Sequence, residues 1–378
     1  MIAKGIFTRY AIWAIILISG PLYATPSISV ITGTTSLVQG GTITISGTGF
    51  TSYSTTTGTF DTFESGNFGT YWADTNDLHI NSGGLNQRNV NSLVNVSTTM
   101  INGATDHGHF QGANTVSRNW YVSFWWKVDP AWVWGTSDFS GTHKWLSNIK
   151  LIRFWNPGST AENLYIAWTG FNTTAIFTTE GYSAPNLETR SLHISSTNLS
   201  VNTWHQFRFQ FVDSSSLGAA DGSVQIFFDT RTVLTETGKV FKDAENLNKR
   251  PQAIGLDNVW SCTEGTPDTG GCYPGTVYLD NVYAYDTIAR VEICDDPTYT
   301  NCQAYPEIQH VNSWTGTSIN VTYNEGSLTG STTQYVFVVD NAGVASAGFA
   351  LLGPAVPPTT SHSGLGGKTS LRGKGALK

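Results

Sequence analysis

The chain has 378 residues, of which 12% are charged and 12% aromatic, with 13 Trp and 39 Gly. Disordered proteins are rich in charge and poor in aromatic residues, so most of this chain is expected to fold. Strong helix formers are scarce whereas Gly, Ser and Thr are abundant, which excludes a helical bundle and favours an all-β protein. The formal net charge of −7 argues against nucleic acid as the main partner.

Residues 1–24 have the order of a secretory signal peptide. Lys4 and Arg9 precede an apolar run over residues 11–18, and the small residue Ala24 follows. This run is shorter than the roughly 20 residues that cross a bilayer, and the sequence offers no other candidate for a membrane span. A membrane anchor is the alternative interpretation. We expect the mature protein to be secreted, either extracellular or periplasmic.

The four cysteines are expected to form disulfides. Local pairing would join Cys262 to Cys272 and Cys294 to Cys302, closing two short loops, and the two other pairings stay open. The spacings do not match the closely spaced cysteine pairs of a zinc site. Oxidised cysteines fit an exported chain.

Strand patterns dominate the middle of the chain, and Gly, Asn, Asp, Ser and Pro clusters separate them. Alternation over residues 204–211 places His205 and three Phe on one face, and Trp204, Gln206, Arg208 and Gln210 on the other. The first face is expected to pack in a core, and the second to face water or a ligand. One helical turn is expected over residues 243–248. Strands are predicted at Val122–Val128, Lys150–Trp155, Leu164–Trp168, Trp204–Val212, Val224–Asp229 and Val277–Tyr285.

The two flanks of this region resemble parts of one small domain. Residues 40–50 read GGTITISGTGF, similar to the opening strands of an immunoglobulin-like IPT/TIG domain, and residues 306–343 resemble its closing strands. The resemblance implies that such a domain is split into residues 25–58 and 287–350, with residues 59–286 inserted into a loop. Three domains in series are the alternative. Residues 351–378 form a basic, Gly/Ser/Pro-rich segment that is expected to be a flexible tail.

The inserted region resembles concanavalin A-like and laminin G-like jelly rolls. The resemblance rests on NTWHQF at 202–207, DGSVQIF at 221–227, and the segments 60–66 and 278–283, which are similar to first and last strands of that fold. It implies a large β-sandwich over residues 59–286. Lectins, carbohydrate-binding modules, glycoside hydrolases, polysaccharide lyases and adhesion domains share this fold, so the fold alone does not assign a function.

A structural calcium ion is implied by the same resemblance. Acidic residues of the first and last strands often share one ion in such jelly rolls, and the matching positions here are Asp61, Glu64 and Asp280. The alternative is that the three acids face solvent separately, or that Asp280 alone caps a turn.

Two groups of residues are candidates for binding carbohydrate. Trp132 and Trp134 lie with His143 in a segment rich in Gly, Pro and Asp, where aromatic rings could stack on sugars. Gln206 and Arg208 have the amide and guanidinium groups that pair with hydroxyls. The alternatives are a core role for the Trp residues, which is favoured for Trp155, and an ordinary solvated sheet face for the polar row.

Catalytic residues are less distinct. The sequence lacks the run of alternating carboxylates that a retaining glycosidase would carry on one strand. A polysaccharide lyase needs a His or Tyr base and an Arg or Gln that neutralises a uronate. His107, His109 and Arg153 are candidates, together with His143 or Tyr182. The spacing of the two neighbouring His residues is also common for metal ligands.

These observations favour a secreted glycan-binding or adhesion protein whose jelly roll binds polysaccharide without catalysis. A polysaccharide lyase or glycoside hydrolase of the same fold is the first alternative, and a structural component of a surface or virion fibre is the second. Polysaccharide is the expected partner, and nucleic acid is not.

Overall fold

The computed structural model describes only part of the chain, and all structural statements below concern that part. It comprises residues 24–33, 37–51, 53, 58–63, 72–73, 78–82, 91–96, 105–106, 109–111, 118–128, 146–155, 163–169, 174–180, 190–195, 199–241, 253–262, 276–302, 305–328 and 333–352. The predicted signal peptide, almost all of the predicted tail and the predicted helical turn lie outside these residues. Strands make up nearly all of the regular secondary structure in the described part, which confirms the all-β prediction.

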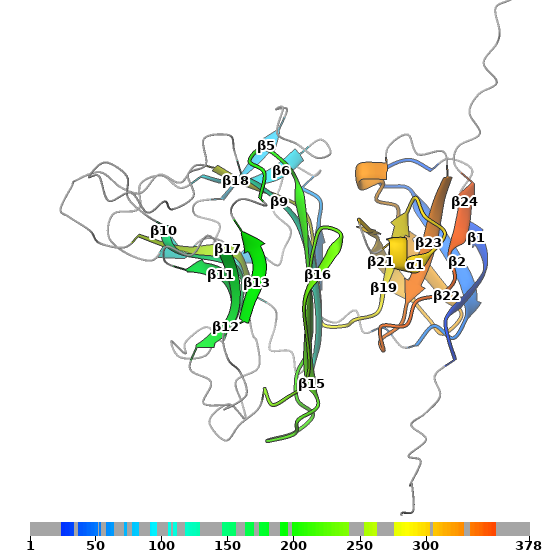
Figure 1. The fold of residues 1–378 in the computed structure, drawn as a ribbon. Coiled ribbons are helices and arrows are strands. Elements are labelled where there is room, and N and C mark those ends of the chain that lie inside the picture. The colour runs from blue at the N-terminus through cyan, green and yellow to red at the C-terminus, as the bar shows by residue number, and fades with distance from the viewer. Residues whose placement is uncertain are drawn as a thin grey trace, which may run out of the picture.

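A small sandwich contains strands from both flanks of the middle region (Figure 1). Its first sheet has the order β1 (Ser27–Thr32), β2 (Thr42–Thr48), β22 (Ser318–Thr322), β21 (His310–Trp314). Its second sheet has the order β20 (Glu307–Ile308), β19 (Arg290–Cys294), β23 (Thr333–Val339), β24 (Phe349–Leu352). The short helix α1 (Tyr299–Cys302) and a 3-10 turn, η2 (Gly326–Leu328), complete it.

Pairing of β2 with β22 joins the two flanks. Ile45 lies opposite Ile319, and both are fully buried in the core of the small sandwich. The pattern TITIS on β2 places Ile43 and Ile45 inside and the hydroxyl side chains outside, as strand alternation requires. The IPT/TIG identity and the domain boundaries stay predictions.

The central sandwich has two larger sheets. We call the first the front sheet: β13 (Arg190–Ser195), β12 (Thr174–Glu180), β11 (Asn163–Thr169), β10 (Leu146–Trp155), β17 (Ala253–Cys262), β8 (His109–Gln111), β4 (Trp72–Ala73), with β7 (Thr105–Asp106) beside β17. The back sheet is β16 (Arg231–Lys239), β15 (Gly222–Phe228), β14 (His205–Val212), β9 (Asn119–Val128), β18 (Thr276–Tyr285), β6 (Asn91–Val96), β5 (Leu78–Ser82), with β3 (Gly58–Asp61) beside β18.

Each of the six predicted strands is present, with bounds that differ by a few residues. The prediction that one face of residues 204–211 packs in a core is confirmed, because Phe207, Phe209 and Phe211 are buried between the sheets. Phe209 of the back sheet contacts Phe154 of the front sheet, with 4.9 Å between ring centroids. Aromatic rings are large enough to fill the space between two stacked sheets, which accounts for their abundance in the sequence.

The central sandwich begins and ends at one place. Strand β3 pairs with the end of β18, with Asp61 opposite Val282 and Gly58 opposite Tyr285. Glycine is required at position 58 because a Cβ atom there would collide with the Tyr285 ring. The chain therefore enters the central sandwich and leaves it at neighbouring positions on the back sheet.

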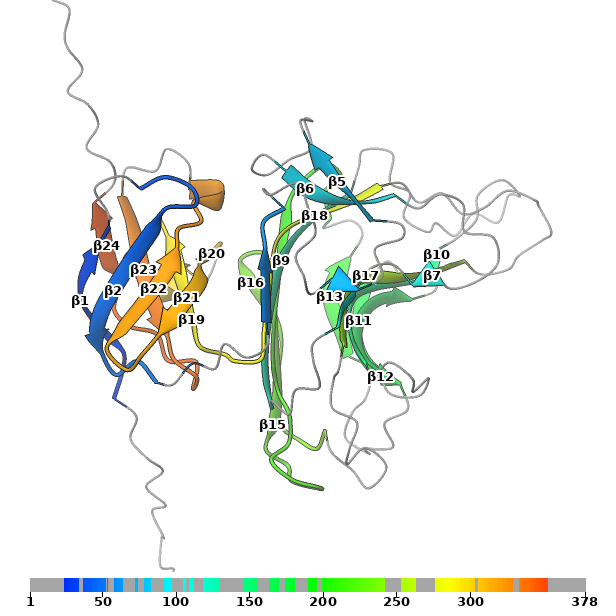
Figure 2. The same ribbon diagram turned by 180° about the vertical axis from the view of Figure 1, so that it is seen from behind.

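The small sandwich packs against the back sheet along a buried seam (Figures 1 and 2). Arg290 of β19 lies with its guanidinium carbon 3.9 Å from the centroid of the Tyr121 ring on β9. The same guanidinium forms a buried ion pair with Glu292. Desolvated cation–π contacts of this kind contribute on the order of 2 kcal/mol. Further along the seam, Phe60 stacks on His310 with 5.8 Å between centroids.

One of the predicted disulfides is present. Cys294 is bonded to Cys302, with their Cα atoms 5.5 Å apart, and the bond ties α1 to β19. The predicted pairing of Cys294 with Cys302 is therefore confirmed. The Cys262–Cys272 bond stays a prediction, because Cys272 and the Cys262 side chain lie outside what the structure describes.

Among the residues described here, no helix has both the length and the apolar character needed to cross a membrane.

Replacing Ile45 with Ala is expected to destabilise the protein by about 2–5 kcal/mol, because it leaves a cavity where the two flanks pair. Urea unfolding of the purified protein measures this change. Val38→Ala is the control, since Val38 is exposed in the same sandwich and its truncation should cost less than about 0.5 kcal/mol. Equal effects of the two substitutions would contradict the packing described.

Asp286 follows β18 at the seam, and burial raises the pKa of its carboxyl from 3.8 to about 6. Ionisation is therefore harder in the folded state than in the unfolded state. Stability associated with this group is complete below the ordinary pKa and is lost as the pH rises through about 6. We expect Asp286→Asn to remove this loss. Urea unfolding of both proteins between pH 3.5 and 7 (roughly the window set by the two values) should show the difference growing with pH. A constant difference would refute the assignment.

Candidate functional site

A row of residues crosses the front sheet at one level. Gly255 of β17 is paired on one side with Arg153 of β10 and on the other with His109 of β8. Arg153 is in turn paired with Tyr165 of β11. Directly paired residues of an antiparallel sheet share a face. The register thus brings two of the three predicted catalytic candidates, His109 and Arg153, onto one face of one sheet.

This face is turned away from the core of the sandwich. The chain neighbours of Arg153 and Gly255 are buried between the sheets, and so is Ile166 next to Tyr165. Strand alternation then assigns these positions to the outer face. These buried neighbours are Ile152, Phe154, Ile166, Ile254 and Leu256. In both ribbon views the front sheet curves away from the back sheet at its two ends, so its outer face is concave (Figures 1 and 2).

The spacing of the row follows from sheet geometry. Neighbouring strands lie about 4.8 Å apart, so Arg153 and Tyr165 are adjacent, whereas Arg153 and His109 are roughly 10 Å apart with Gly255 between them. Glycine in a strand often marks a place where a ligand approaches the backbone closely. Arg153 is half-buried and Gly255 is buried.

Strand β10 adds two more residues to this face. Trp155 is two positions beyond Arg153, and Lys150 is paired with Ala167, which alternates with the buried Ile166. Core packing was favoured for Trp155, and that interpretation stays a prediction, because the Trp155 side chain lies outside what the structure describes. Lys150 and Tyr165 were not selected from the sequence. The alternation LYIAW over residues 164–168 was the signal that could have placed Tyr165 on the opposite face of the strand from the buried Ile166.

Five other candidates fall outside the described structure. They are His107, Trp132, Trp134, His143 and Tyr182. The roles predicted for these residues stay predictions.

Gln206 and Arg208 occupy the outer face of the back sheet, as alternation predicts, but this face is not open to water. Only 1% of Gln206 and 2% of Arg208 is exposed. Gln206 donates from Nε2 to the Pro306 carbonyl of the small sandwich at 2.8 Å, and the Arg208 guanidinium lies over the Phe227 ring. The expected exposure of this polar row is therefore wrong, because the small sandwich covers it.

The acids predicted to bind calcium have different surroundings. Asp61 is paired with the core residue Val282 and accepts a hydrogen bond from the Phe63 amide at 2.8 Å. Asp280 is paired with Trp125 on the face that meets the small sandwich. Glu64 lies outside the described structure, and within it no group of three His, Cys, Asp or Glu residues could hold a metal. The calcium ion stays a prediction.

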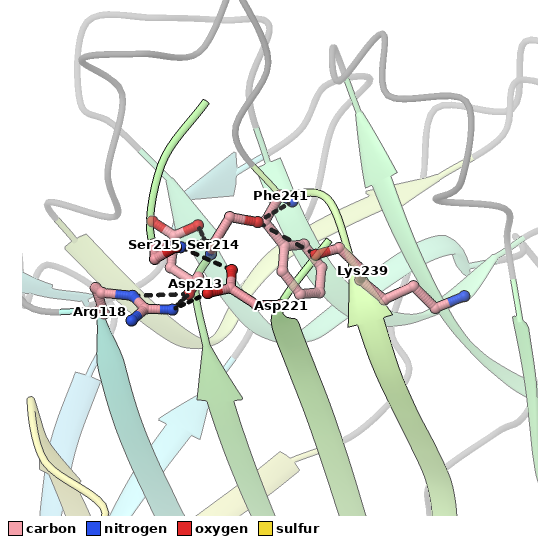
Figure 3. Close-up of polar contacts among 7 residues, drawn as sticks. All are labelled: Arg118, Asp213, Ser214, Ser215, Asp221, Lys239 and Phe241. Atoms are coloured by element: carbon pink, nitrogen blue, oxygen red, sulfur yellow. Dashed lines mark hydrogen bonds and ion pairs between the residues drawn. The ribbon is translucent and has the colours of Figure 1, made fainter. Parts of the chain in front are cut away.

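A polar cluster at the end of the back sheet has a structural role (Figure 3). Arg118 donates to the Asp213 carbonyl at 2.7 and 3.0 Å and forms an ion pair with Asp221 at 3.4 Å. Asp221 also accepts a hydrogen bond from the Ser215 amide, which lowers the pKa of its carboxyl. Ser214 accepts a hydrogen bond from the Phe241 amide at 2.8 Å. These contacts hold the loop after β14 against β16.

No protein-family model matches the sequence, and no curated protein matches it. Solved structures resemble the fold at low identity. An endo-β-1,4-glucuronan lyase from Trichoderma reesei is 13% identical, with a TM-score of 0.40, over 58% of this chain and 92% of the lyase. An alginate lyase from Aplysia kurodai is 10% identical, with a TM-score of 0.36, over 55% and 86%. A botulinum neurotoxin serotype D binding domain is 13% identical, with a TM-score of 0.30, over 55% and 43%.

Proposed function

We propose that the chain is a secreted polysaccharide lyase that cleaves an acidic polysaccharide on the outer face of the front sheet. The observation that carries the proposal is the row in which Gly255 separates Arg153 and Tyr165 from His109. A glucuronan lyase and alginate lyases are among the solved structures of similar fold. The expected signal peptide and the Cys294–Cys302 disulfide support an exported protein.

The residue types of the row suit β-elimination of a uronate. Arg153 would pair with the uronate carboxylate through two hydrogen bonds and stabilise the negative charge that develops when the C5 proton leaves. That proton passes to a base as the C4–O4 bond breaks, a C4=C5 double bond forms, and the leaving oxygen takes up a proton. Tyr165 and His109 are the residues of the row that can accept and donate protons.

The surrounding face supports binding of a charged sugar chain. We assign Lys150 to electrostatic attraction of neighbouring uronates and Trp155 to stacking against a sugar ring, since both share the strand and the face of Arg153. Gly255 leaves the middle of the row without a side chain, which allows a sugar ring to approach the sheet. The concave curvature of the front sheet suits an extended polymer (Figure 2).

Replacing Arg153 with Gln is expected to lower the rate of cleavage by about a hundredfold, because the developing charge loses its cation. Purified wild-type and variant proteins are incubated with alginate, pectin and a glycosaminoglycan. The ultraviolet absorbance of unsaturated uronate ends reports cleavage. Arg231→Gln is the matched control, because Arg231 is an exposed arginine on the edge of the back sheet and its removal should leave the rate unchanged.

The same experiment separates lyase from binding protein. If the wild-type protein is retarded in gels that contain these polymers but releases no unsaturated ends, the chain is a binding protein and the lyase proposal is wrong. If it neither binds nor cleaves any acidic polymer, the proposed use of the row is wrong.

Proton transfer can be assigned by a pair of conservative substitutions. Tyr165→Phe removes only the hydroxyl of the residue paired with Arg153, so we expect kcat to fall by roughly a hundredfold while KM changes little. His109 is paired with Gly255 on the side away from Arg153. An equal loss of kcat in His109→Gln would show that both residues transfer protons. Steady-state kinetics on the best polymer measure both. Unchanged kcat in both variants would remove the row from the chemistry.

A further inference from the structure

Tyr305 presents a flat aromatic surface where the two sandwiches meet. It is 43% exposed, although its ring stacks on Trp125 with 6.0 Å between centroids and 19° between planes. Trp125 belongs to β9 of the back sheet and is buried. Because the near-parallel Trp ring covers one face of Tyr305, the exposed area includes the opposite face. A buried ring thus supports an exposed one.

The polar surroundings of Tyr305 are held in place. The next residue, Pro306, accepts the 2.8 Å hydrogen bond from Gln206 Nε2, which fixes this segment to β14. Gln206 also connects this segment to Asp229, because its backbone N–H donates to the Asp229 carboxylate while its side chain binds Pro306. Burial and the negative charge of Asp229 raise the pKa of the Tyr305 hydroxyl. The Asp229 side chain is 19% exposed. It accepts one hydrogen bond from His205 Nδ1 at 2.8 Å and one from the backbone N–H of Gln206 at 2.9 Å.

A carboxylate has about four acceptor positions, so these two bonds leave Asp229 able to accept hydroxyl groups as well. A flat aromatic ring beside a rigid carboxylate acceptor is suited to a sugar, whose C–H face stacks on the ring while its hydroxyls donate to the acid. A uronate would bring its own negative charge towards Asp229, which disfavours it. The arrangement therefore selects uncharged sugar residues.

We propose that Tyr305 and Asp229 form a second carbohydrate-binding site, which takes an uncharged sugar residue at the seam between the two sandwiches. The site draws Tyr305 from the small sandwich and Asp229 from the central one. It lies at the back sheet, whereas the proposed catalytic row lies on the outer face of the front sheet (Figures 1 and 2). Such a site would anchor the protein to a neutral polymer while the front sheet remains open.

The test is native affinity electrophoresis of the full mature chain in gels that contain xyloglucan, mixed-linkage β-glucan or galactomannan. The wild type should be retarded by at least one of these neutral polymers. Tyr305→Leu keeps an apolar side chain over Trp125 but removes the flat ring, and should weaken that binding by roughly three- to tenfold. Tyr305→Phe keeps the ring and should bind nearly as well as the wild type.

Two controls test whether a loss of binding is specific to the Tyr305 ring. Leu217→Ala removes another exposed apolar side chain, in the loop after β14, and should leave retardation unchanged. Thermal unfolding of Tyr305→Leu shows whether the seam is intact, and cleavage of acidic polymers should match the wild type whether or not neutral binding is lost. Absence of retardation by all three polymers, or equal retardation of wild type and Tyr305→Leu, would overturn the proposal and leave the lyase proposal untouched.

Discussion

The pairing of β2 with β22 is the constraint on which the arrangement depends. It joins segments that precede and follow the central sandwich, and buries Ile45 against Ile319 in one core. Because both segments belong to one sheet, the chain must leave and return at neighbouring points. The pairing of β3 with β18 satisfies this requirement, since it places the first and last strands of the central sandwich side by side.

This closure gives the two sheets of the central sandwich different surroundings. The back sheet meets the small sandwich, and its outward side chains serve that contact: Tyr121 lies under Arg290, and Gln206 is bonded to Pro306. Buried polar groups need such partners, because an unpaired one would cost roughly 1–3 kcal/mol. On the front sheet, the register brings Arg153 and His109 to the outer face, which is the face that the proposed function assigns to the polymer.

Much of the local structure could be predicted from the sequence. Alternation of apolar and polar residues predicted six strands, and the short Cys294–Cys302 spacing predicted the observed disulfide. The site was predicted only in pieces. Arg153 and His109 were selected for their chemistry, but they lie on different strands far apart in the sequence. Their relation depends on β17, whose Gly255 pairs with both, and such long-range pairing is not encoded in any local pattern.

By itself, the sequence determined an all-β chain and the division of each strand into an apolar and a polar face, because side chains alternate along any strand. Only the tertiary structure decided what covers each polar face. Gln206 and Arg208 have the pattern of a solvated row, yet both are buried, since the small sandwich packs over them. Alternation separates two faces of a strand, whereas the packing of distant segments determines which face is left to a ligand.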